Sequence, residues 1–414
     1  MARATPPLSR DARFLLIGAA VDAFGTGLTL PFLVVYLHQI RGLPLETIGL
    51  LVAVPALVAL VLLAPVGALV DSIGPRRVQM VAHAGAAAGA LLMSRADTVA
   101  LAFAARVLVG IGHAAFWPAN QSLIASVLPG ERRQRYFGVS FALLNAGIGV
   151  GGIIGAVYVD VGYPETFTTV YVADALTFLV PLVLLALPLR HVGGPLVERA
   201  AGDEPKGTYR EVLRDPVFRR VLAVVFVSAF VGYGQIEGGW TAYANAIARV
   251  STRTMGLAFA ANTTVIVLSQ LVVLRLIDGR RRTRLLVLLA ALWATSWAVM
   301  GLAGLRPATP LAAGLIITAF SVFAVGETLL SPVSPAIIND VAPDRLRGRY
   351  NATAGFAFQL AAIAAPAIAG VVLGTGHGVA FIGMLVTGCG VLAALALVLE
   401  ARLSPRANGL APPA

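Results

Sequence analysis

The chain has 414 residues, of which 58% are hydrophobic and only 12% are charged, and its mean hydropathy is +0.84. Soluble domains are about 45–50% apolar and about 25% charged, so this composition excludes an ordinary water-soluble domain, which could not cover its apolar surface. The net charge of +11 does not indicate a nucleic-acid partner, because most of the 31 basic residues lie in alternate loops and in the tails, the positive-inside pattern of a membrane protein whose termini and central loop are cytoplasmic.

Hydrophobic runs follow one another along the whole chain. A helix needs roughly 20 apolar residues to cross a bilayer, and the first run, at 14–37, meets that length. It is too long for the apolar core of a signal peptide, so we interpret it as a transmembrane helix. Twelve helices are predicted, at about 14–37, 47–70, 78–95, 98–124, 138–158, 166–188, 219–247, 254–277, 285–304, 309–337, 350–373 and 378–399.

The longest polar segment lies in the middle of the chain. It begins with a Gly/Pro-rich, charged stretch that is typical of a solvated linker. Thr208 and Glu211 then form a capping-box pattern, which predicts a short amphipathic helix at 208–214 on the cytoplasmic membrane face. The predicted organisation is an N-terminal six-helix bundle at 1–190, a cytoplasmic central loop at 191–217, a C-terminal six-helix bundle at 218–403 and a cytoplasmic tail at 404–414.

The two halves of the chain repeat each other. Residues 112–136 and 326–350 align without a gap at a constant offset of 214. Eight pairs are identical: Gly112/Gly326, Pro118/Pro332, Ile124/Ile338, Val127/Val341, Pro129/Pro343, Arg133/Arg347, Arg135/Arg349 and Tyr136/Tyr350. Six-helix halves with the same orientation are parallel repeats about an axis along the membrane normal, which is the arrangement of the major facilitator fold. The sequence therefore predicts an all-α membrane protein with twelve transmembrane helices in two pseudo-symmetric bundles.

The loop between the second and third predicted helices resembles the signature loop of the major facilitator superfamily, G-x-x-x-D-R/K-x-G-R-R/K. Ser72 and Pro75 depart from that pattern. The resemblance implies a conformational gate: a small residue allows close helix approach, and the aspartate pairs with a cation or a helix N-terminus to hold the cytoplasmic side shut. The candidate gate residues are Gly67, Asp71, Gly74, Arg76 and Arg77, with Asp278 as the counterpart in the second half.

Further motifs resemble the drug:proton antiporters of this superfamily. Arg106, followed by Gly110, is similar to the R-x-x-x-G motif of proton-coupled exporters, although an arginine at this depth could also reach the outer interface. The fifth predicted helix resembles the antiporters' glycine-rich motif, with Gly152 at its proline position; ordinary small-residue packing explains the same pattern equally well. The candidate packing glycines are Gly147, Gly151, Gly152 and Gly155.

Four acids lie inside apolar runs, at Asp22, Asp174, Glu237 and Glu327. Each would cost about 2.5–3.5 kcal/mol if it faced lipid in its charged form, so these side chains must face an interior, be paired or be protonated. The sequence around Glu327, Asp22 and Glu237 resembles one bacterial multidrug-efflux branch, in which the acid of the tenth helix is a proposed protonation and cation-binding site. We assign Asp174 a structural role between neighbouring helices.

In the major facilitator fold, the first, fourth, seventh and tenth helices line a central cavity. The resemblance thus places Asp22, Arg106, Glu237 and Glu327 there as proton-coupling residues. Other candidate residues of this substrate cavity are Tyr36, His113, Phe116, Trp117, Gln235, Trp240, Phe320 and Phe323. Burial in an apolar site favours the protonated form of a carboxyl group, which suits an acid to load and release a proton. Three acids against one base favour protons and lipophilic cations over anions.

The resulting hypothesis is a bacterial inner-membrane protein that exports small lipophilic, neutral or cationic compounds in exchange for protons, and so a candidate for multidrug resistance. Its expected partners are a small-molecule substrate, protons and the lipid bilayer, with no nucleic acid, no cofactor beyond the proton gradient and a monomeric state. A proton-coupled uptake symporter for a nutrient and a non-transporting membrane sensor are the alternatives. An enzyme is not expected, because the sequence has no nucleophile–base pattern or phosphate loop, and the single Cys389 excludes a cysteine-rich metal site.

Overall fold

The computed structural model describes residues 9–128, 130–193, 208–277, 279–343 and 346–410 of the chain. Helices dominate this part of the chain. Those of the first half are α1 (Arg10–Thr29), α2 (Leu33–Val35), α3 (Leu45–Ile73), α4 (Pro75–Met93), α5 (Val99–Val127), α6 (Gly130–Tyr158) and α7 (Glu165–Ala186). Those of the second half are α8 (Tyr209–Arg214), α9 (Pro216–Val231), α10 (Tyr233–Gln235), α11 (Thr252–Ile277), α12 (Arg282–Gly304), α13 (Pro310–Val341), α14 (Arg347–Gly374) and α15 (Gly378–Glu400).

Two of the predicted helices are interrupted. After α1 the chain continues through a 3-10 turn at Leu30–Phe32, α2 and a π-helix at Tyr36–Ile40. After α9 it continues through α10 and two π-helices, Ile236–Trp240 and Tyr243–Ile247. Short π segments are frequent at functional sites, because they re-aim side chains within a helix. Both interruptions fall in predicted helices that carry candidate cavity residues.

Helix starts follow the polar residues before each apolar run. Thr98 and Thr309 accept hydrogen bonds from the backbone N–H groups of Leu101 and Ala312, both at 3.2 Å. Thr208 caps α8 in the same way, so the short helix expected in the central loop is present. These side chains satisfy donors that have no partner within the helix.

Ten helices of the described residues are long and apolar enough to cross a membrane. They are Arg10–Ile40, Leu45–Leu62, Val99–Phe116, Val139–Tyr158, Glu165–Ala186, Pro216–Trp240, Arg282–Gly304, Pro310–Val341, Gly348–Gly374 and Gly378–Glu400. The predicted third and eighth helices are present as α4 and α11 but do not belong to this set. Both carry polar residues, such as His83 in α4 and Asn262 in α11. The chain is a multi-pass α-helical protein, and the count of twelve spans stays a prediction.

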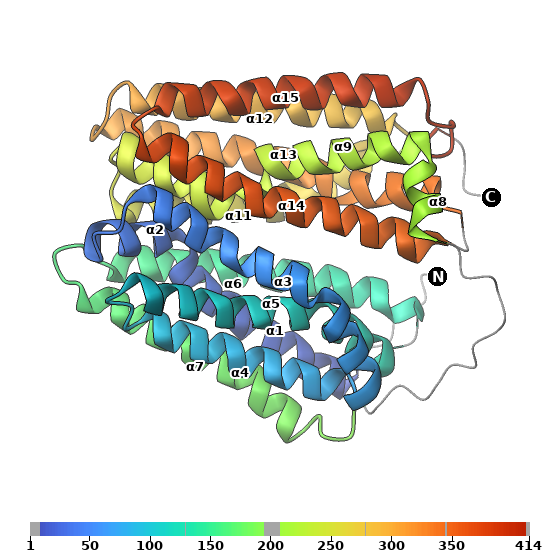
Figure 1. Cartoon of the computed structure of the whole chain (residues 1–414), viewed down its shortest axis with the longest axis horizontal. Helices are drawn as coiled ribbons and strands as arrows, with labels where there is room; N and C mark the ends of the chain where they lie inside the picture. The colour runs from blue at the N-terminus through green and yellow to red at the C-terminus, as the bar shows by residue number, and fades with distance from the viewer. Residues whose placement is uncertain (1–8, 129, 194–207, 278, 344–345, 411–414) are drawn as a thin grey trace. The chain divides into compact units, whose positions relative to one another are not determined.

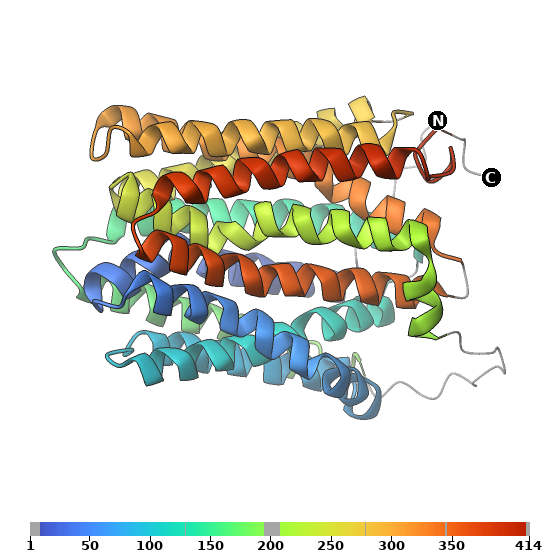
Figure 2. The ribbon, with the colours of Figure 1, turned by 45° about the horizontal axis from the view of Figure 1, so that its top comes forward.

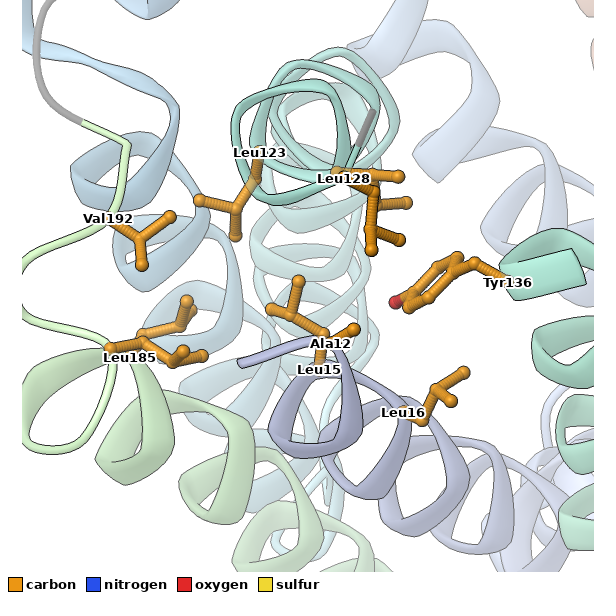
Figure 3. Packing of buried hydrophobic residues seen from close by; sticks show 10 residues of the cluster. Ala12, Leu15, Leu16, Leu123, Leu128, Tyr136, Leu185 and Val192 are labelled. Atoms are coloured by element: carbon orange, nitrogen blue, oxygen red, sulfur yellow. The ribbon is translucent and has the colours of Figure 1, made fainter. Parts of the chain in front are cut away.

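Contacts divide the chain into two compact units. The first consists of Met1–Leu30 and Val54–Ala201, and the second of Pro31–Ala53 and Gly202–Ala414. Within the first unit, α1 packs against α6 and α7, and α4 packs against α5 and α7. One of its cores is a cluster from four helices, in which the ring of Tyr136 lies near Leu16 and Leu128 (Figure 3). The other members of the cluster are Ala12, Leu15, Leu123, Ile124, Leu185, Leu189 and Val192.

Within the second unit, α12 lies beside α13 and α15, and α9 lies beside α14 and α15 (Figures 1 and 2). The segment Pro31–Ala53, which the predicted boundaries place in the N-terminal bundle, groups with this unit. Glycines explain its tight packing, because a side chain at Gly49 would meet the Cα atom of Gly370 in α14 at 2.9 Å. Pro31–Ala53 is thus part of the second unit, although it lies in the first half of the sequence.

Candidate functional site

A buried carboxylate with two hydrogen-bond donors is the most developed polar site of the second unit. Glu327 lies in α13 and is only 7% exposed. Its Oε2 atom accepts a hydrogen bond of 2.9 Å from Nδ2 of Asn262 in α11. The Tyr233 hydroxyl in α10 is a second hydrogen-bond partner of the Glu327 carboxylate. Three elements therefore converge on one acid within an apolar bundle.

Asn262 and Trp293 hold this site in place. The amide of Asn262 also donates to the backbone carbonyl of Phe320, at 3.2 Å, which is two helical turns from Glu327 on α13. The indole of Trp293 donates to the Phe323 carbonyl at 3.0 Å, and it fills the space that side chains at Gly232 and Gly326 would need. Gly232 is the break between α9 and α10, and Gly326 directly precedes Glu327. Trp293 thus sets the positions of both chain segments that supply the site.

An aromatic cluster lies in the same unit. The Trp240 ring stacks on Phe320 with centroids 4.2 Å apart and meets the edge of Phe259 at 5.4 Å. Phe320 in turn lies 5.9 Å from Phe323. The indole N–H of Trp240 is buried and has no hydrogen-bond partner among the described residues. The cluster offers flat π faces, which can attract a cation.

Two acids lie in the interior of the first unit. Asp174 in α7 is buried, and its Oδ2 accepts a hydrogen bond of 3.1 Å from the Thr29 hydroxyl at the end of α1. Asp22 in α1 is partly buried. The Oδ1 atom of each aspartate is enclosed and has no hydrogen-bond partner among the described residues. The expected structural bond of Asp174 to a neighbouring helix is therefore present.

The family model of the Major Facilitator Superfamily matches residues 15–320 and 238–413 of this chain. The chain belongs to the Major Facilitator Superfamily. A Bacillus subtilis MFS-type transporter, YqjV, is 22% identical over 360 residues, which are 86% of this chain and 85% of YqjV. The class C tetracycline resistance protein of Escherichia coli is 26% identical over 61% of this chain and 63% of its own length. The quinolone resistance protein NorA of Staphylococcus aureus is 27% identical over 40% of this chain and 42% of its own.

Solved transporter structures have the same fold. A POT family transporter in complex with 5-aminolevulinic acid superimposes with a TM-score of 0.78 at 17% identity, covering 95% of this chain and 96% of that one. A bacterial homologue of the lysosomal transporter Spinster gives 0.63 at 15% identity, over 94% and 95% of the two chains. The protein is thus a multi-pass membrane transporter with the major facilitator fold, and not an enzyme.

The other predicted proton-coupling and cavity residues of this superfamily member have varied surroundings. Arg106 in α5 is buried, whereas Glu237, in the π-helix after α10, is partly buried. His113 is exposed on α5, and Phe116 lines a small pocket inside the first unit together with His83. The side chain of Trp117 lies outside the described residues.

Two predicted cavity residues make contacts within the protein. The Tyr36 ring is fully buried, and its hydroxyl accepts hydrogen bonds from Arg41 at 2.7 and 3.0 Å. The amide of Gln235 is also fully buried and donates to the Phe230 carbonyl at 3.1 Å, across the helix break. Each of these side chains thus stabilises an interrupted part of a helix.

Only some of the predicted gate residues belong to the described part of the structure. Gly74 has φ of 88° and directly precedes α4, a conformation that strongly favours glycine. Arg76 donates to the Leu185 carbonyl at 3.0 Å and so ties the start of α4 to the end of α7, whereas Arg77 is exposed. The surroundings of Gly67 and the side chain of Asp71, both in α3, are not described, and Asp278 lies outside the described residues.

The predicted packing glycines lie in α6. A side chain at Gly147 would meet Ala20 and Ala23 of α1 at 2.9 Å, and one at Gly151 would meet Gly27 at 3.0 Å. The two backbones approach closely along this seam, as small residues allow in membranes. Gly152 and Gly155 are buried in the same helix.

Four side chains that contact or position the buried acids were not among the predicted site residues: Asn262, Tyr233, Trp293 and Thr29. Asn262 left a usable signal, because an amide inside an apolar run must find a partner. Trp293 and Thr29 left none, since tryptophan and threonine are common in membrane helices for packing and for local backbone bonds.

Proposed function

We propose that this transporter exports small lipophilic, neutral or cationic compounds in exchange for protons by alternating access, from a bacterial cytoplasmic membrane. The observation that carries the proposal is the Glu327 site. An acid inside an apolar bundle is costly and marks ion or proton pathways. Here the acid has donors from Asn262 and Tyr233 that stabilise its charged form, so it can exist in both protonation states.

The aromatic cluster supports the substrate class. Trp240, Phe259 and Phe320 form one contiguous, buried group of rings, and aromatic rings attract cations and bury apolar groups. The partner-free indole N–H of Trp240 could donate to an acceptor on a bound compound. The tetracycline and quinolone resistance proteins among the relatives point to the same class of substrate.

In the mechanism, Glu327 takes up a proton from the outer side and releases it to the cytoplasm, while the substrate moves in the opposite direction. Release of the proton leaves a negative charge on α13, the helix that also carries Phe320 of the aromatic cluster. This charge raises the affinity for a lipophilic cation on the cytoplasmic side, and reprotonation lowers it on the outer side. The two events are coupled because they use the same carboxylate.

Inside-out membrane vesicles test this proposal. An acid-inside proton gradient is imposed, and a tetracycline, a quinolone or a lipophilic cation is added to the medium. We expect substrate-induced proton release from vesicles with the wild-type protein and none from vesicles with Glu327→Gln. Asp160→Asn is the control, because Asp160 is an acid in an exposed loop. Full proton release with Glu327→Gln contradicts the proposal, and accumulation of a nutrient by intact cells would replace export with uptake.

A further inference from the structure

The short helix α8 lies across the ends of α9 and α14, whereas those two helices run along the bundle of the second unit (Figures 1 and 2). It ends at Arg214, and the apolar span Pro216–Trp240 begins two residues later. The span Gly348–Gly374 of α14 also begins beside α8. Because two spans start here, α8 lies at the membrane surface, where lipid headgroups are found.

Hydrogen bonds and buried rings hold α8 against the bundle. Asp215, the residue after α8, accepts hydrogen bonds from the backbone N–H groups of Val217 and Phe218 at 2.8 and 3.1 Å, and so caps α9. Its Oδ2 atom accepts a third, of 2.9 Å, from the Tyr350 hydroxyl of α14. The rings of Phe218 and Tyr350 are buried 4.2 Å apart, and Val212 of α8 is also fully buried. The outer face of α8 therefore has a fixed position in the second unit.

This outer face carries an apolar pair beside a basic pair. Tyr209 and Leu213 are 57% and 50% exposed, and they share one face of α8 because they are four residues apart. Arg210 and Arg214 are also exposed and form the neighbouring face by the same spacing. Such an arrangement is typical of helices in the membrane interface, where rings and aliphatic groups enter the lipid and basic groups meet the headgroups.

The surroundings of this face are positively charged. Five arginines with described side chains lie on α8, in the first turns of α9 and at the start of α14: Arg210, Arg214, Arg219, Arg220 and Arg349. The guanidinium of Arg349 is 6.0 Å from the centre of the Tyr209 ring, so α14 adds its charge directly to the face. The same segments, 208–220 and 347–350, contain two acids, Glu211 and Asp215. None of the five arginines forms an ion pair with another described residue, and an anion would complement them.

The chemistry of the face indicates what this anion is. Guanidinium groups bind phosphate through paired N–H donors. A free phosphate would use these donors alone, whereas a phospholipid also places its acyl chains against Tyr209 and Leu213. A headgroup with a net negative charge complements the arginines, but the choline ammonium of phosphatidylcholine would be repelled by them.

We propose that the outer face of α8, together with the start of α14, binds the headgroup of an anionic phospholipid such as phosphatidylglycerol. Arg210 and Arg214 contact the phosphate, and Arg349 adds positive charge beside Tyr209. The bound lipid would hold the starts of α9 and α14 at one depth in the membrane. This site goes beyond the proposed export function and does not depend on it.

Native mass spectrometry of the full-length protein in detergent tests the site, because it resolves the number of lipids bound to each molecule. Phosphatidylglycerol and phosphatidylcholine with identical oleoyl chains are titrated separately, and the dissociation constant of the first lipid to bind is measured. We expect the wild type to bind phosphatidylglycerol more tightly. Arg210→Gln combined with Arg214→Gln should weaken phosphatidylglycerol binding about 10- to 30-fold and leave phosphatidylcholine binding unchanged. Leu213→Ser, which removes a contact with the chains, should weaken both lipids alike.

Arg253→Gln combined with Arg306→Gln is the matched control. Both arginines are exposed at the far end of the second unit, where the backbone N–H of Ala308 donates to the carbonyl of Ala248. The control should leave phosphatidylglycerol binding unchanged. A loss as large as that of the α8 pair would show a general attraction to positive charge and overturn the proposal, as would equal affinities of the wild type for the two lipids.

Inorganic phosphate separates a lipid site from a site for any phosphate. Added at the concentration of the lipid, it should not displace phosphatidylglycerol, because it makes no contact with Tyr209 and Leu213. Displacement would show that the face binds phosphate alone and would also overturn the proposal. The replaced arginines are exposed, so SDS-induced unfolding of the variants should match the wild type. Any of these lipid-binding results leaves the Glu327 mechanism to its own test in vesicles.

Discussion

The two units of this transporter each bury acids, but they prepare them differently. In the second unit, Glu327 receives hydrogen bonds from Asn262 and Tyr233, whereas in the first unit Asp22 and Asp174 each keep a buried oxygen without a donor. Donors favour the charged form of a carboxyl group, and their absence favours the neutral form. The comparison teaches that chemically similar acids can be held differently: Glu327 by donors from two other helices, and Asp174 by the Thr29 hydroxyl with one enclosed oxygen left over.

The largest expected effect concerns the Glu327 site of the second unit. Trp293→Ala removes the indole that fills the space at Gly232 and Gly326, and with it the packing that positions Tyr233 and Glu327. Truncation of a buried tryptophan costs about 3–5 kcal/mol. We expect a loss of this size in the free energy of unfolding, measured from SDS-induced unfolding in mixed micelles, together with loss of substrate-induced proton release. Trp293→Phe, which keeps a ring, should lose less; equal stability of Trp293→Ala and wild type contradicts the positioning role.

The same helices show how much of the fold and of the candidate site could be predicted from the sequence. The apolar runs predicted where the helices lie, because bilayer thickness dictates their length, but not the breaks after α1 and α9. The acids Asp22, Asp174 and Glu327 were also identifiable, since a charge inside such a run needs a reason. The partners of these acids were not identifiable. Thr29, Tyr233 and Trp293 come close to them only because helices that are distant in the sequence pack with particular faces together. The grouping of Pro31–Ala53 with the second unit depends on close glycine contacts that no local pattern reveals.

The next prediction concerns the loss of one hydrogen-bond donor at Glu327. Asn262→Leu removes the amide that donates to Glu327 and to the Phe320 carbonyl. A hydrogen bond to a charged group contributes about 1.5–3 kcal/mol, so we expect a destabilisation of this order in SDS-induced unfolding. The control is a double-mutant cycle: in the Glu327→Gln background the same change should cost clearly less. An equal cost in both backgrounds would mean that Asn262 acts only on the backbone.

A smaller effect is expected where α1 packs against α7 in the first unit. Gly25→Ala places a methyl group 2.5 Å from Oδ1 of Asp174 and 2.9 Å from Cβ of Thr177. Overpacking of this kind costs about 1–3 kcal/mol. Gly383→Ala in α15 is the matched control, because its methyl group would meet nothing within 4 Å. That control should be neutral or stabilising by about 0.5–1 kcal/mol, since alanine favours helix more than glycine does. Similar unfolding curves for both variants would show that this contact is not tightly packed.

The smallest expected effect reports the charge state of Asp174. Thr29→Val keeps the shape of the side chain and removes the hydroxyl that donates to Oδ2 of Asp174. A hydrogen bond to a neutral group contributes about 0.5–1.5 kcal/mol and one to a charged group about 1.5–3 kcal/mol, so the size of the loss reports the state of the carboxyl group. We expect the loss at neutral pH to lie in the lower range, because Asp174 is buried among apolar helices and one of its oxygens has no donor among the described residues. A loss in the upper range would mean that Thr29 donates to an ionised Asp174, as Asn262 does to the charged form of Glu327, and the contrast between the two units would disappear.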